Sequence, residues 1–356
     1  MEHPDLPYVL APNYVSPTHQ HNSLGFKGKD ITVAKDPSKK RIVVIGASTT
    51  YGMYVQSQET YAGRLEALLN ESGDNVEVIN AGVPGYVSTE VLLNLQLRVL
   101  PLQPDLIILY EGRNDLMPQS FNNFTTDYSH YRRKVRFDSS NYYLKKVFSV
   151  SRLAMLLCTY KGDRCGWSTR LEDPAYAGIR YENVPNDAQL IRNLEDPQRS
   201  SVYRRSIEQI VLLSRESNAN VLLATMAVRA EMFSTGVLNV PRRNSPGNDH
   251  DPAIYDALQK QVDENNQILR EVALAHGVPV AETHILSEHP ELFVDDCHMR
   301  QAGHSLRAKI LFDAIRKHGL LEEKGRTRVA RRMRIRTRNS MVRRPSGDYP
   351  RCLEPV

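Results

Sequence analysis

The stretch that decides the fold runs from Arg41 to Gly52 and reads RIVVIGASTTYG. Its apolar run, 42–45, stops at Gly46 and is followed by the small residues Ala47 and Ser48. A short apolar run that ends in a small-residue turn is typical of a buried parallel strand. Ligands bind at the carboxyl ends of such strands. Ser48 is therefore either a nucleophile at that end or a hydroxyl that caps the following helix.

Four further apolar runs resemble the first one in length and character, at 76–79, 106–109, 221–225 and 278–281. The segments between them repeat apolar residues at helical spacing, as Tyr61, Leu65 and Leu69 do. Strands that alternate with helices predict an α/β protein with a parallel five-stranded sheet and helices on both faces. The loops after the first, second, third and fifth strands hold small or polar residues, and we expect them to share one rim of the sheet.

Length and composition are those of an ordinary globular protein with a sizeable core: 356 residues, 41% hydrophobic and 24% charged. We expect an extended N-terminal arm at 1–40, in which Phe26 packs on the body, and one α/β domain at 41–320. A polar, Tyr-rich insertion at about 116–199 interrupts this domain, with one helix expected from Tyr142 to Leu157. A basic tail follows at 321–356.

The positive net charge belongs to the tail. From Lys324 to the last residue there are eleven Lys and Arg and two acidic residues, a charge of +9, which leaves −4 for the rest of the chain. Such a run suits contact with nucleic acid or an anionic lipid surface. A solvated, disordered tail is the interpretation that the composition favours.

No apolar stretch approaches the roughly 20 residues that a membrane-spanning helix needs. The first forty residues lack a basic start followed by an apolar run, so we expect no signal peptide and favour the cytoplasm unless the N-terminus is truncated. Cys158 and Cys165 lie close enough in sequence to pair in an oxidising compartment, whereas Cys297 and Cys352 have no evident partner. No Cys/His cluster has metal-site spacing, so we expect free thiols, no metal and no cofactor.

Four blocks at the predicted strand ends carry the chemistry: Gly46–Thr50, Asn80–Gly82, Gly112–Asp115 and Asp295–His298. Together they resemble the SGNH (GDSL-like) hydrolase family, which is named for a Ser, a Gly, an Asn and a His in four such blocks. The resemblance covers roughly residues 20–317, includes the lead-in Asn22–Gly28, and leaves the insertion and the tail unmatched. It implies a flavodoxin-like, three-layer α/β/α sandwich, in agreement with the strand pattern. Ala47 stands where the family's motif has Asp, which leaves the nucleophile unaffected.

The catalytic roles follow from the chemistry and from the resemblance. Ser48 attacks an acyl carbonyl once a base removes its proton, and His298 is the candidate base. Asp295 lies three residues before His298 and orients its ring. Residues three apart on a helix-like turn face each other, whereas residues two apart do not. We therefore expect Asp296 to point away and to act as a turn or cap residue.

The oxyanion that this attack creates needs preorganised donors. The candidates are the backbone N–H of Ser48, that of Gly82, whose unhindered backbone lets the substrate approach, and the side-chain amide of Asn114. Without that role, Gly82 is a turn glycine and Asn114 a turn-forming residue. We expect Asp115 to brace its loop and Arg113 to point to solvent or into the insertion.

These residues predict a serine esterase that hydrolyses an acyl or acetyl ester of a small molecule or glycan through a covalent acyl-enzyme. An O-acyltransferase of the same fold that acts on a glycan would use the same residues. A non-catalytic binding protein is the third possibility, and the complete set of catalytic residues argues against it. His304, six residues after His298, is expected on a helix face.

Overall fold

The computed structural model describes residues 1, 3–133, 178–229 and 252–322. The expected helix at 142–157, the pair Cys158 and Cys165, and the basic tail from residue 323 onward lie outside these residues.

The core of the fold is a parallel sheet of five strands in the order β2-β1-β3-β4-β5. The strands are β1 (Lys40–Gly46), β2 (Val76–Asn80), β3 (Leu106–Tyr110), β4 (Asn220–Ala224) and β5 (Val280–Ala281). The predicted fold class is confirmed, because this order is that of flavodoxin-like sheets. Gly46 pairs with Tyr110, so β1 and β3 end side by side and release their loops at the same rim.

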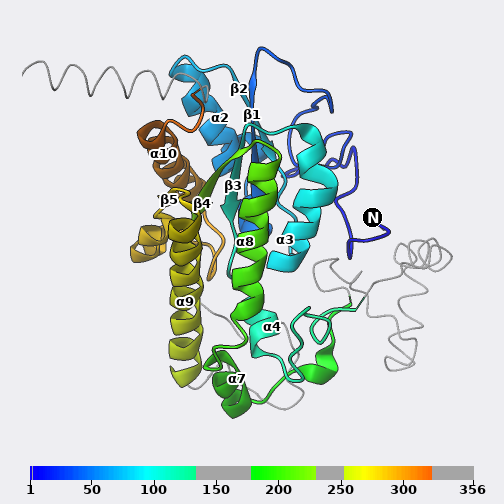
Figure 1. Cartoon of the computed structure of the whole chain (residues 1–356), viewed down its shortest axis with the longest axis vertical. Coiled ribbons are helices and arrows are strands. Elements are labelled where there is room, and N and C mark those ends of the chain that lie inside the picture. The colour runs from blue at the N-terminus through cyan, green and yellow to red at the C-terminus, as the bar shows by residue number, and fades with distance from the viewer. Residues whose placement is uncertain (2, 134–177, 230–251, 323–356) are drawn as a thin grey trace, which may run out of the picture.

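Helices cover both faces of the sheet, because successive strand residues point to opposite sides. Ile42 and Val44 lie in one hydrophobic cluster with α2 (Tyr61–Glu71) and α10 (Gln301–His318). Val43 and Ile45 lie in another with α3 (Ser88–Asn94), α8 (Ser201–Glu216) and the end of α9 (Pro252–His276). Figure 1 shows α8 and α3 next to one another over the sheet and α10 beside α2.

At the start of two helices near the rim, distant residues accept hydrogen bonds from the first turn, in addition to the local caps. The Ser88 N–H and hydroxyl, at the start of α3, donate to the Asp115 carboxylate over 2.9 and 2.5 Å. The N–H of Tyr61, at the start of α2, donates to Nδ1 of His304 over 3.2 Å. Asp115 thus braces its loop against α3, and His304, although it lies on a helix, is buried against α2.

The N-terminal arm packs on the body of the protein. Phe26 is buried in the same cluster as Val43 and Ile45, as the sequence predicted. The neighbouring Lys27 is also buried, and its Nζ donates to the carbonyls of Gly52 and Val55 over 2.8 and 2.7 Å. Burial lowers the pKa of Lys27 to about 7, against a smaller opposing effect of the Glu59 charge. The arm therefore holds the segment that follows Ser48.

The described parts of the insertion include α4 (Leu116–Ser120) and α7 (Asp187–Leu194), which lie beyond one end of the sheet in Figure 1. The first half of α9 reaches this region and shares a hydrophobic cluster with α7. None of the helices within the described residues is both long and apolar enough to cross a membrane.

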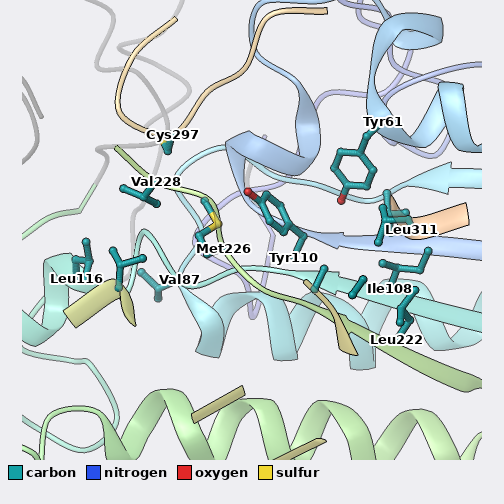
Figure 2. Close-up of a cluster of buried hydrophobic side chains, with 14 of the residues drawn as sticks. Tyr61, Val87, Ile108, Tyr110, Leu116, Leu222, Met226, Val228, Cys297 and Leu311 are labelled. Atoms are coloured by element: carbon teal, nitrogen blue, oxygen red, sulfur yellow. The ribbon is translucent and has the colours of Figure 1, made fainter. Parts of the chain in front are cut away.

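The same cluster extends beneath the loop that carries His298. Figure 2 shows Cys297 at the edge of the cluster, with Val228 and Met226 nearby, while Tyr110 lies nearer its centre. Burial of Cys297 fixes one side of the loop 293–299, whose ends pair through an antiparallel bridge between Phe293 and Met299.

Candidate active site

Ser48 begins α1 (Ser48–Tyr51) directly after β1. The turn between them needs Gly46, which has φ +155°, because a Cβ there would lie 2.2 Å from the Tyr110 carbonyl oxygen and 2.4 Å from Thr50 Oγ1. Ala47, rather than Ser48, occupies the N-cap position of α1, and no side chain caps this helix. The cap interpretation of Ser48 is therefore wrong. Its N–H lies in the first turn, where helical geometry provides no intrahelical acceptor.

Gly82 lies against α1. The absence of a side chain lets the backbone of α1 approach, whereas we had expected it to let the substrate approach. A Cβ on Gly82 would lie 2.4 Å from the Tyr51 nitrogen and 2.9 Å from the Ala47 oxygen. The expected room for substrate is thus filled by the backbone of α1, which corrects the reason that we gave for this glycine. Its N–H donates to Asn80 Oδ1 over 3.0 Å. An oxyanion at this site would share the N–H with Asn80, and the donor role of Gly82 stays a prediction.

Asn114 lies in the loop after β3 and is half-buried. Its Nδ2 donates to the Tyr86 carbonyl oxygen over 2.8 Å. An amide nitrogen carries two hydrogens, and this bond uses one of them while it fixes the orientation of the group. The oxyanion role predicted for Asn114 is compatible with this geometry and stays a prediction.

Asp295 and His298 are in direct contact. Nδ1 of His298 donates to the two carboxylate oxygens of Asp295 over 2.8 and 3.0 Å. The N–H groups of Cys297 and His298 donate to Asp295 Oδ1 over 3.0 and 2.8 Å. Burial alone would raise the pKa of Asp295, but these hydrogen bonds and the nearby His298 outweigh it and lower the pKa to about 2. Asp295 is therefore ionised at neutral pH.

Nε2, the other ring nitrogen of His298, is buried and has no hydrogen-bond partner among the described residues. Because Nδ1 faces a carboxylate, it carries the proton of the neutral ring, which leaves the lone pair on Nε2. A buried polar atom without a partner is uncommon in folded proteins and calls for an explanation, and a group that binds or reacts there is one such explanation. The imidazole is thus oriented to accept a proton at Nε2.

Arg113 and Asp296 form a buried ion pair, so Arg113 does not point to solvent and Asp296 has a partner beyond its own turn. Arg113 Nε donates to Asp296 Oδ2 over 2.8 Å, and the two side chains are only 13% and 11% exposed. The expectation that Arg113 points to solvent is wrong, because the loops after β3 and β5 meet and the two side chains pair between them. Asp296 points away from His298, as predicted, and its carboxylate faces Arg113. Burial lowers the pKa of Arg113, but the charge of Asp296 more than compensates and raises it overall.

Tyr54 is a site residue that the sequence analysis missed. Its hydroxyl donates to Asp295 Oδ2 over 3.3 Å, and its ring meets the His298 ring edge-on, with centroids 5.6 Å apart. Tyr54 lies six residues after Ser48, so it connects the segment of the candidate nucleophile with that of the candidate base. Its sequence neighbours, Met53 and Val55, show no pattern that would have marked it.

The ligand atoms of Asp295, Cys297 and His298 lie within 4.8 Å of one another, a set that could hold a metal ion by distance alone. The donor chemistry does not fit, because the carboxylate and Nδ1 already bind each other. Burial also raises the pKa of Cys297 well above its usual value. A neutral thiol is a poor ligand, since metals bind the thiolate. The cluster is therefore best described as a hydrogen-bonded acid–base pair beside a buried thiol.

The predicted residues thus gather at one rim of a parallel α/β sheet. Asp295 and His298 touch, while Ser48 and Asn114 follow the paired ends of β1 and β3. Tyr54 and Arg113 link these segments to the loop of His298. A parallel sheet with an oriented histidine and a serine at its carboxyl rim is the architecture of a class of hydrolytic enzymes.

Residues 44–158 match the model of the GDSL-like Lipase/Acylhydrolase family, a family of hydrolases, so this part of the chain is similar to that family. This segment contains the blocks of Ser48, Gly82 and Asn114. The resemblance inferred from the sequence is therefore confirmed.

Solved structures give remote likenesses. The α/β hydrolase LAE5 from the metagenome of Lake Arreo, Spain, is 16% identical, with TM-score 0.44 and 80% of this chain and 97% of that chain covered. The lipase/acylhydrolase of Enterococcus faecalis is 18% identical, with TM-score 0.44, and the match covers 78% of this chain and 96% of that chain. A mutant of Axe2, an acetylxylan esterase from Geobacillus stearothermophilus, is 13% identical, with TM-score 0.43, and the match covers 78% of this chain and 94% of that chain. Comparison with curated proteins gives no significant match. The fold assignment rests on the strand order and not on these likenesses.

Proposed function

We propose that this hydrolase is a serine esterase, with Ser48 as nucleophile, His298 as base and Asp295 as the orienting acid. The observation that carries the proposal is the state of His298: Nδ1 is held by an ionised carboxylate, and Nε2 is buried without a partner. Nε2 removes the proton of the Ser48 hydroxyl as its oxygen attacks the ester carbonyl, and Asp295 stabilises the imidazolium that forms.

The tetrahedral intermediate carries its negative charge on the former carbonyl oxygen. The second hydrogen of the Asn114 amide and the Ser48 N–H are its donors, and Gly82 contributes if its N–H is shared with Asn80. The imidazolium then protonates the departing alcohol, which leaves an acyl group on Ser48. Water, activated by His298, cleaves this acyl-enzyme and releases the acid. We propose a small-molecule or glycan ester as the substrate class, with an acyl or acetyl group as the acid part.

The experiment is a comparison of Ser48→Ala with the wild-type chain on esters of increasing acyl length and on acetylated glycans. We expect hydrolysis and labelling by a serine-directed fluorophosphonate to be lost, with unfolding unchanged, because the half-buried Ser48 side chain does not cap α1. Turnover retained in the folded variant would exclude Ser48 as the nucleophile. Transfer of the acyl group to an added glycan, without release of free acid, would identify an O-acyltransferase instead.

A further inference from the structure

The ion pair of Arg113 and Asp296 connects the two loops of the proposed mechanism. It joins residues 183 positions apart in the sequence, with a contact of 2.8 Å between side chains that are 13% and 11% exposed. Neither side chain has a chemical role in the mechanism proposed above. The pair therefore calls for an explanation of its own.

Each member of the pair is adjacent in sequence to a proposed catalytic group. Arg113 directly precedes Asn114, whose amide orientation is fixed by its bond to Tyr86. Asp296 directly follows Asp295, the residue that holds the His298 ring. A shift of Arg113 is thus transmitted to the Asn114 donor, and a shift of Asp296 to the residue that orients the base, each over one peptide unit.

The loop around Asp296 is too tightly bonded to absorb such a shift locally. The Val294 N–H donates to the His298 carbonyl over 2.8 Å, and the Arg229 N–H donates to the Asp296 carbonyl over 2.8 Å. Since Cys297 is buried beneath it as well, the loop is held together as one unit, and the Arg113 contact connects this unit to the loop after β3.

Stability alone does not account for the pair. Desolvation of two charges offsets most of their attraction, so a buried ion pair is often no more stabilising than apolar residues of similar size. What a guanidinium–carboxylate contact does provide is a defined geometry, because the planar fork has directional donors.

We propose that the pair of Arg113 and Asp296 is a positioning pair, which sets the distance between the Asn114 amide and the His298 imidazole. It couples stabilisation of the oxyanion to proton transfer, so that both are aligned in the same transition state. This inference rests on the proposed function of Ser48, His298 and Asn114, and it adds a device that aligns them.

The test is a double-mutant cycle on ester hydrolysis with Asp296→Asn and Asn114→Ala. We expect Asp296→Asn to lower kcat by roughly 10- to 100-fold with KM changed less than about 3-fold, since a misplacement near 1 Å has an effect of that size. Asn114→Ala should lower kcat roughly 100-fold or more. In the Asn114→Ala background, Asp296→Asn should lower kcat by less than about 3-fold, because the effects of coupled residues are non-additive.

Glu77→Gln is the matched control. Glu77 pairs with Arg41 over 2.8 Å, with side chains 13% and 0% exposed, at the opposite, amino end of the strands. We expect this variant to change the denaturant midpoint no less than Asp296→Asn does, while kcat stays at the wild-type value. Arg113→Lys keeps the charge but not the fork and should lower kcat roughly 3- to 10-fold, which tests the idea if Asp296→Asn does not fold.

The outcomes separate the two levels of the proposal. Additive effects of Asp296→Asn and Asn114→Ala, or equal losses of kcat in Asp296→Asn and Glu77→Gln, would overturn the positioning role and leave the esterase proposal standing. Absence of any Ser48-dependent ester turnover in the wild-type chain would overturn the proposed function and this inference together.

Discussion

Two loops at the rim of the sheet present the proposed nucleophile and the proposed base, and they are held in different ways. The loop of Ser48 is fixed by the fit of its backbone, since Gly46 and Gly82 each bring main chains closer than a Cβ would allow. The loop of His298 is fixed by side-chain carboxylates, since Asp295 accepts backbone N–H groups and Asp296 pairs with Arg113.

This difference separates stability from activity. A side chain at Gly46 or Gly82 would clash with neighbouring backbone, so substitutions at these positions in the first loop should mainly lower the free energy of unfolding. Carboxylates in the second loop can be replaced by amides that keep the shape and some of the bonds. Substitutions there should act mainly on catalysis, and the three predictions below test this contrast.

The largest effect is expected in the loop of His298. His298→Ala removes the base and should lower kcat by roughly 10⁴-fold or more, and Asp295→Asn by roughly 10³- to 10⁴-fold. The amide oxygen can still accept the N–H groups of Cys297 and His298, but it no longer favours the proton on Nδ1. We expect the midpoint of urea unfolding to change little in either variant.

Glu291→Gln is the control for that comparison, because Glu291 also faces a histidine, His289, over 3.2 Å, but in an exposed pair. It should leave kcat unchanged. A strongly destabilised Asp295→Asn with near-normal kcat would reverse our assignment of the two loops.

An intermediate effect, on stability, is expected in the loop of Ser48. Gly46→Ala places a Cβ 2.2 Å from the Tyr110 oxygen and should lower the free energy of unfolding by about 3 kcal/mol or more. Gly28→Ala is the matched control, because Gly28 also has a positive φ, +129°, but nothing within 4 Å of its Cβ position. Gly28→Ala should lower the free energy of unfolding by only about 1 kcal/mol. Equal midpoints for the two variants in urea would show that the close approach at Gly46 is unimportant.

The smallest effect concerns the pH dependence of stability. The pKa of Lys27 is about 7 in the folded protein, against 10.5 for a free lysine, so folding releases a proton between these values. The free energy of unfolding should therefore rise with pH in this window, by at most about 1.4 kcal/mol per pH unit from this group. Lys27→Met should remove this contribution. Urea titrations from pH 7.5 to 9.5 test the prediction, and an unchanged slope in the variant would contradict it.

Much of the fold follows from local patterns in the sequence. The apolar runs stand out because β1, β3 and β4 are buried along nearly their whole length, and small or polar residues follow most of the runs. The five strands and their common rim were therefore predictable. The predicted extent of the last strand was only partly right: the strand was expected at 278–281, and β5 comprises Val280 and Ala281 alone.

In the candidate site, too, local contacts could be predicted from the sequence, and contacts between distant loops could not. The contact of Asp295 with His298 follows from their spacing of three on one loop, which is local geometry. The pairing of Arg113 with Asp296 and the position of Tyr54 depend on how loops from different strands meet, and one sequence contains no local signal for that. Gly82 shows a further limit, because the sequence indicated a close approach but not that α1, rather than a substrate, makes it.

The edge-on contact of Tyr54 with His298 has a spectroscopic consequence. The circulating electrons of an aromatic ring shift the resonances of protons held beside it, and the His298 ring lies edge-on to that of Tyr54. The imidazole proton signals of His298 therefore report whether Tyr54 is in place. Because Tyr54 is half-exposed, a ligand that moves it would be seen in those signals before any bond is made or broken.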